Sequence, residues 1–247
     1  MKTLDDPAVT ELTLDVERLS PSVSCLRKQP RFTREWEHVS YAIEAGGEVV
    51  LFDPPPIFNE NSVKTVCALG QLTTLVISHT DFVGSAQCWK EALGLRVFMG
   101  CDEPLPGNCI EVDQRVTAPM QVAGLHLVPL PGHSEGSIGI VAELDGRRSF
   151  VAGDALAVWD HSDGRTQIAN FEAPGQFSHA TRSVLGDVNP EVLACCTGYL
   201  VAGGKVAPLL LEAPEPSARP YLGETGGVWR RPDGTFSYES SSLPENS

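Results

Sequence analysis

Residues 74–86 have the sequence TLVISHTDFVGSA, and this stretch decides the fold class of the chain. The apolar run from Thr74 to Ile77 predicts a buried strand, and the sequence after Gly84 has helical spacing. Polar residues that join a strand to a helix often carry function, because a rigid scaffold holds them in place. His79 and Asp81 are the candidate functional residues of this junction.

Two later stretches have the same form. LVPLPGHSEGS (residues 127–137) places His133 after a predicted strand, and RSFVAGDAL (residues 148–156) places Asp154 after another. With His79 and Asp81 they supply two imidazoles and two carboxylates, a donor set that suits divalent zinc or iron. In the alternative interpretation, each is a loop residue that hydrogen-bonds to its own backbone.

Short β-branched runs alternate with amphipathic segments along the chain, as in folds that layer sheets and helices. Gly46-Gly47 and Asp145-Gly146 have the composition of tight hairpin turns. Gly94 is placed to end a helix. The predicted strands are His38–Ala45, Glu48–Phe52, Thr74–Ile77, Leu95–Met99, Leu125–Leu130, Ile138–Leu144, Ser149–Ala152 and Glu191–Cys195, and the predicted helices are Ser62–Leu69, Ser85–Leu93 and Phe177–Leu185.

In this order the segments resemble the metallo-β-lactamase superfamily over residues 38–204. The resemblance includes the hairpin that ends in an aspartate, the H-x-H-x-D-H loop, and the P-G-H-T-x-G-S, G-D-A-L and G-H-G motifs. The matching residues are 41–53, 77–84, 131–137, 153–156 and 196–198. The resemblance implies an α/β (α+β) fold, an αββα sandwich of two mixed sheets flanked by helices, with the site at one edge of the sheets.

Three positions depart from the family motifs, because Ile77, Phe82 and Thr197 stand where the family has histidines. The resemblance therefore implies a reduced ligand set of His79, His133 and Asp154, with Asp81 nearby. We expect at most one divalent ion of zinc, iron or manganese, or none. Thiolates suit zinc, but Cys195 and Cys196 are adjacent in a strand and face opposite ways, so we expect core cysteines.

Residues 132–136, GHSEG, also match the G-x-S-x-G nucleophile elbow of α/β-hydrolases, which would make Ser134 the nucleophile. That elbow requires a helix after the serine, whereas Ile138–Leu144 is predicted to be a strand. The context therefore favours the metal-site interpretation.

Composition limits the partners. The chain has 247 residues with 42% hydrophobic content and a net charge of −14, which disfavours nucleic acid and anionic membranes. Neither a signal peptide nor a membrane span is evident, so we expect a cytoplasmic protein. Seven cysteines without a CxxC pair argue against a disulfide framework, and we expect most of them to be buried.

We expect residues 1–211 to form the metallo-β-lactamase-like domain and residues 212–247 a proline-rich C-terminal extension with a surface hairpin over 228–238. The resemblance implies a hydrolase that acts on a small-molecule ester, lactone or thioester, with Asp81 as general base. The alternative is a catalytically inactive or metal-free member that binds a small molecule or protein partner in the same pocket.

Overall fold

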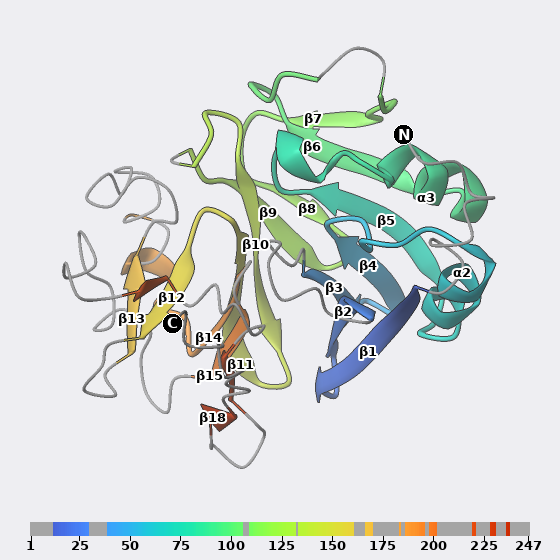
Figure 1. Cartoon of the computed structure of the whole chain (residues 1–247). Coiled ribbons are helices and arrows are strands. Elements are labelled where there is room, and N and C mark those ends of the chain that lie inside the picture. Colours follow the sequence, from blue (N-terminus) through green and yellow to red (C-terminus); the bar gives the residue numbers. More distant parts are fainter. Residues whose placement is uncertain are drawn as a thin grey trace, which may run out of the picture.

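The structure is a computed structural model. It describes residues 12–29, 39–105, 109–131, 133–160, 166–169, 183, 186–195, 198–201, 219–220, 228–230 and 236–237. Two β-sheets pack face to face, and helices α2 (Glu60–Cys67) and α3 (Ala86–Leu93) cover the outer face of the first sheet (Figure 1).

The first sheet has seven strands in the order β1-β2-β3-β4-β5-β6-β7. Its first four strands are antiparallel neighbours, whereas β4 to β7 run parallel. Gly46 and Gly47 have φ values of 60° and 83° in the β3–β4 turn, as predicted for a tight hairpin. The strands are β1 (Thr13–Ser20), β2 (Val23–Gln29), β3 (Ser40–Ala45), β4 (Glu48–Phe52), β5 (Leu72–Ile77), β6 (Arg96–Gly100) and β7 (Gln114–Val116).

The second sheet has the order β18-β17-β15-β14-β11-β10-β9-β8, and a small third sheet has the order β13-β12-β16. Parallel pairs in the second sheet are β11–β14 and β15–β17. The strands are β8 (Met120–Val122), β9 (Leu125–Pro129), β10 (Ile138–Leu144), β11 (Arg147–Gly153), β12 (Ala157–Asp160), β13 (Thr166–Ala169), β14 (Val192–Cys195), β15 (Gly198–Val201), β16 (Arg219–Pro220), β17 (Val228–Arg230) and β18 (Phe236–Ser237).

Two apolar cores hold these layers together. One lies between the sheets, and the other lies between the first sheet and helices α2 (Glu60–Cys67) and α3 (Ala86–Leu93). Strand β5 serves both, since Val76 belongs to the first core and Leu75 and Ile77 to the second. Helix α3 ends at Gly94, which has the left-handed conformation that the sequence predicts.

The predicted sandwich of two mixed sheets is confirmed. Strands β1 and β2 were not predicted, because they carry many charged residues and the sheet edge buries little of β1. Of the predicted helix Phe177–Leu185, the structure describes only Ser183. None of the helices in the described ranges is long and apolar enough to cross a membrane.

The prediction that most cysteines are buried was wrong. Among the six described cysteines, Cys67, Cys88 and Cys101 are exposed, and only Cys25 and Cys195 are buried. The first two lie on or at the end of helix faces that turn toward solvent, and Cys101 lies in a turn after β6. Cysteine is often a buried residue, but these three cysteines show that residue type alone does not predict burial.

The C-terminal extension contributes strands to the second sheet. Strand β17 pairs with β15 in parallel, and β18 pairs with β17 in antiparallel orientation; the residues between β17 and β18 lie outside the described residues. Because β18 is the outermost strand and has two residues, deleting residues 232–247 should leave a folded domain whose melting temperature falls by no more than a few degrees. Thermal melting by circular dichroism measures this; aggregation or a broad transition would show that the extension supports the core.

Candidate metal centre

His79 follows the end of β5 in an extended conformation, directly before the short 3-10 helix η1 (Thr80–Phe82). Its side chain is buried, and its Nδ1 atom lies 3.1 Å from Ser78 Oγ. The Ser78 backbone is held from both sides, since its N–H donates to Asp53 Oδ1 (2.7 Å) and its carbonyl accepts from Ile138 N–H (2.9 Å). The imidazole is therefore fixed between the two sheets.

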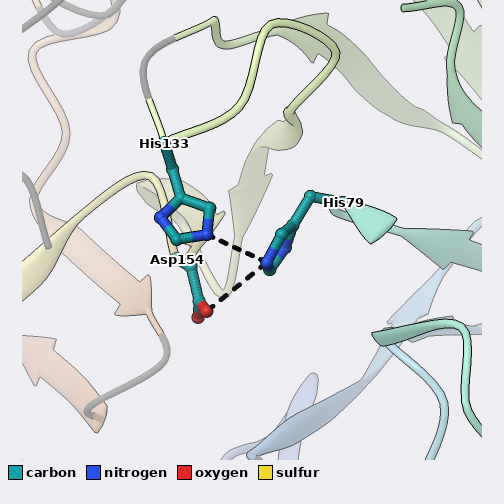
Figure 2. A group of neighbouring side chains, drawn as sticks. All are labelled: His79, His133 and Asp154. Atoms are coloured by element: carbon teal, nitrogen blue, oxygen red, sulfur yellow. Dashed lines mark hydrogen bonds and ion pairs between the residues drawn. The ribbon is translucent and has the colours of Figure 1, made fainter. Parts of the chain in front are cut away.

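Three polar groups converge on His79 Nε2. His133 Nε2 lies 3.0 Å away and Asp154 Oδ2 3.6 Å away. Figure 2 shows both side chains directed toward His79. Asp81 Oδ2 lies at 3.5 Å. His133 comes from the loop between β9 and β10, and Asp154 directly follows β11.

His79, His133 and Asp154 fit a divalent ion. Each offers one ligand atom, and these atoms all lie within 4.8 Å of one another. Bonds of about 2.0–2.1 Å in a tetrahedral site separate neighbouring ligand atoms by about 3.3 Å, so the observed spacing requires only small side-chain adjustments. Two imidazoles and one carboxylate leave a coordination position open, as catalytic rather than structural zinc sites do.

The protonation of His79 suits a ligand. The pKa of His79 is lowered from 6.5 to about 4, mainly by burial and also by the nearby His133, while Asp81 opposes the shift. The imidazole is thus neutral at pH 7, which is the form that binds metals. A proton on Nδ1, donated to Ser78 Oγ, leaves the Nε2 lone pair directed at the other ligands.

Asp53 supports the site from behind. It follows β4 with a φ of 60°, is wholly buried, and accepts the Ser78 N–H. Burial raises the pKa of this carboxyl well above its ordinary value, and the nearby Asp154 raises it too, whereas the Ser78 hydrogen bond lowers it. Gly153 packs against this point, since a Cβ there would lie 2.8 Å from Ser78 Oγ.

The remaining predicted site residues have different surroundings. The Asp81 side chain is 69% exposed and faces solvent beside the cluster. The Phe82 and His79 rings pack edge to face, with their centroids 4.7 Å apart. Ile77 is fully buried in the apolar core under α2 and α3, and Thr197 lies outside the described residues.

The structure does not support Cys195 as a substitute zinc ligand or Ser134 as a nucleophile. Cys195 is buried in β14 and is not part of the cluster, and Cys196 lies outside the described residues. Ser134 is followed by β10 rather than by a helix, so the nucleophile-elbow interpretation is wrong.

Asp53 and Glu103 also support the site, although neither was predicted to belong to it. Both follow strands of the first sheet, β4 and β6, that run parallel to β5 on either side of it. The carboxyl ends of parallel strands meet at one edge of a sheet, so residues after β4, β5 and β6 lie near one another. Acidic residues within three positions of the ends of these strands were the available signal.

Comparisons with known proteins agree with this architecture. No family model matches the sequence, and neither does any curated protein. Solved structures do match: DIM-1 metallo-β-lactamase aligns with a TM-score of 0.58 and 12% identity over 81% of this chain and 95% of that chain. VMB-1 aligns at 0.56 and 14% identity over 79% and 93%. TTHA1623 in a di-iron-bound form aligns at 0.50 and 20% identity over 68% and 91%.

The chain therefore has the metallo-β-lactamase fold. It carries a His-His-Asp cluster at the edge where its two sheets meet, and this cluster could hold a metal ion.

Proposed function

We propose that the protein is a metal-dependent hydrolase with a single divalent ion at His79, His133 and Asp154. The observation that carries this proposal is the convergence of three ligand atoms from three separate loops within 4.8 Å. A similar structure is a metallo-β-lactamase, and another was determined in a di-iron-bound form. One ion rather than two follows from Phe82 and Thr197, which replace imidazoles that the second ion would need.

A divalent ion at this position supplies Lewis acidity that polarises a carbonyl group and makes water more acidic. Asp81 is an exposed carboxylate 3.5 Å from His79 Nε2, so it can accept a proton from water beside the cluster. Phe82 provides an apolar wall next to His79, which suits the acyl part of a substrate. We therefore propose esters, lactones or thioesters as the substrate class.

A metal-free binding protein is the second candidate. His79 and His133 lie 3.0 Å apart through their Nε2 atoms, so the two imidazoles can satisfy each other by a hydrogen bond without an ion. The same apolar wall could then hold a small molecule or a segment of a partner protein.

We also propose a cytoplasmic location and a small-molecule ligand. The six described cysteines are all free, as expected in a reducing compartment. The net charge of −14 disfavours nucleic acid as a partner.

Protein purified without chelators should contain at most about one equivalent of zinc, iron or manganese, because only one ligand set is complete. Elemental analysis gives the count, and hydrolysis of a nitrophenyl ester, a γ-lactone and an acyl thioester is measured before and after chelation. One equivalent together with chelator-sensitive hydrolysis supports the proposal. Two tightly held ions would contradict the single site, and protein that cannot be loaded with metal would favour the binding protein.

A further inference from the structure

Glu103 connects two loops, the one that carries His79 and the one that carries His133, through its buried carboxylate. We call these the two histidine loops. Its side chain follows β6 and is 3% exposed. Its Oε2 atom accepts a hydrogen bond from Thr80 N–H (2.8 Å), and its Oε1 atom accepts one from Ser134 Oγ. Thr80 is the residue after His79, and Ser134 is the residue after His133, so a single side chain fixes the neighbours of both imidazoles.

The segment that carries Glu103 is itself anchored. Arg115 Nη1 donates to the carbonyls of Gly100 (2.8 Å) and Glu103 (3.1 Å). Thr80 Oγ1 donates to the carbonyl of Pro104 (2.6 Å), which gives a second bond between this segment and the His79 loop. The carboxylate therefore projects from a backbone that cannot shift easily when its partners move.

The His133 loop is tied to the same segment and to itself. Ser134 N–H donates to Ser137 Oγ (3.2 Å), and the two hydroxyl oxygens lie 2.6 Å apart. The contact is too close for a side chain at position 136, because a Cβ on Gly136 would lie 2.4 Å from Glu103 N. Glycine there lets the two loops touch through their backbones.

We propose that Glu103 is a positioning residue that sets the separation of His79 and His133 for metal binding. The inference rests on the proposed metal site, because positioning matters only if an ion uses both imidazoles. Partners outside the ligand set commonly change metal affinity by about 10- to 100-fold, because they fix the orientation of the ligands. A merely structural Glu103 would instead support folding and leave the affinity of folded protein for zinc unchanged.

The test compares zinc affinity and stability in matched variants. Glu103→Ala removes both hydrogen bonds and should weaken zinc binding about 10- to 100-fold, measured by competition with a chromophoric chelator. Glu103→Gln should keep affinity within a few-fold of the parent, because its amide can accept from Thr80 N–H and donate to Ser134 Oγ. Ser134→Ala removes only one of the two hydrogen bonds, so its zinc affinity should lie between those of the parent and Glu103→Ala. Adding Ser134→Ala to Glu103→Ala should lower zinc affinity by less than Ser134→Ala does in the parent, because the hydrogen bond is already absent.

Asp113→Asn is the structural control. Asp113 Oδ2 also accepts a backbone N–H, from Val97 (2.8 Å), and it lies 2.9 Å from Lys90 Nζ, so its loss should affect stability. Neither contact reaches a histidine loop, so zinc affinity should stay within about two-fold of the parent. If Glu103→Ala and Ser134→Ala behave like this control, or if Glu103→Gln is as weak as Glu103→Ala, the positioning role is wrong. Should Glu103→Ala fail to fold, Ser134→Ala alone decides between these outcomes.

A second measurement separates this inference from the proposed function. Hydrogen exchange on metal-free protein should show that Glu103→Ala speeds exchange in both peptides that cover residues 79–83 and 133–137, and that Asp113→Asn does not. Exchange that is unchanged in either peptide overturns the link between the loops. A parent protein that binds none of zinc, iron and manganese, with exchange altered as expected, would overturn the proposed function and leave Glu103 as a connection between loops without a metal to position.

Discussion

The Gly100→Ala variant should lose about 3 kcal/mol or more of its free energy of unfolding. A Cβ on Gly100 would lie 1.7 Å from the carbonyl oxygen of Gly136, and backbone atoms on both sides leave no flexible side chain to move away. The last residue of β6 would have to separate from the His133 loop, which would also pull Glu103 from Ser134. Urea denaturation monitored by tryptophan fluorescence measures the loss, and zinc affinity should fall with it.

Gly84→Ala is the matched control for this prediction. A Cβ at Gly84 would have no heavy atom within 4 Å, and the residue is not among those with positive φ, so alanine fits without strain. The free energy of unfolding of Gly84→Ala should stay within about 1 kcal/mol of the parent's. Any change should be an increase, because alanine restricts the unfolded chain more than glycine does. Equal stability of the two variants would show that the β6 end and the His133 loop are not in close contact.

The His79→Ala variant should lower zinc affinity about 10²- to 10³-fold. Structural zinc sites bind with an apparent free energy of about 10–16 kcal/mol shared by four ligands, so one ligand accounts for a loss of this size. The effect should exceed that of any other single substitution in the cluster, because His133, Asp154 and Asp81 all face its Nε2 atom. Isothermal titration of chelator-treated protein with zinc gives the affinity, and hydrolysis should be lost in parallel.

His126→Ala controls for the general effect of removing a histidine. His126 lies in β9 and is exposed. Its Nε2 atom lies 3.1 Å from Gln121 Nε2, and it is not part of the cluster. Its zinc affinity and melting temperature should match those of the parent. If His79→Ala retains parental zinc affinity, the ion binds elsewhere and the ligand set proposed here is wrong.

Much of the fold follows from short-range pattern. The hairpin turn at Asp145-Gly146 has φ values of 54° and 71°, and the strand Ile138–Leu144 has the predicted bounds. Both depend on neighbours in sequence, since a turn needs residues that accept positive φ and a strand needs alternation. Strand β1 was not predicted, because its sequence TLDVERLS mixes charge into the alternation, and its place at a sheet edge does not require a clean apolar face.

The candidate ligands could be named from sequence because each follows a strand within a recognisable motif. His79, His133 and Asp154 were proposed from their junctions, and the structure brings all three together. Phe82 shows the limit of such motifs, since only the structure placed its ring edge-on against His79. Ile77 stands at a ligand position of the family, yet its burial under the helices makes it a core residue here.

By itself, the sequence determined the strands with clear alternation, the tight turns and the three residues of the cluster, because these depend on local conformation and on motif spacing. The tertiary structure decided which distant residues support them. Glu103 is 23 residues from Thr80 and 31 from Ser134, and only the packing of β6 beside β5 and of Gly100 against Gly136 brings them into hydrogen-bonding distance. A buried carboxylate requires partners that exclude water, and no local pattern specifies which loops will provide them.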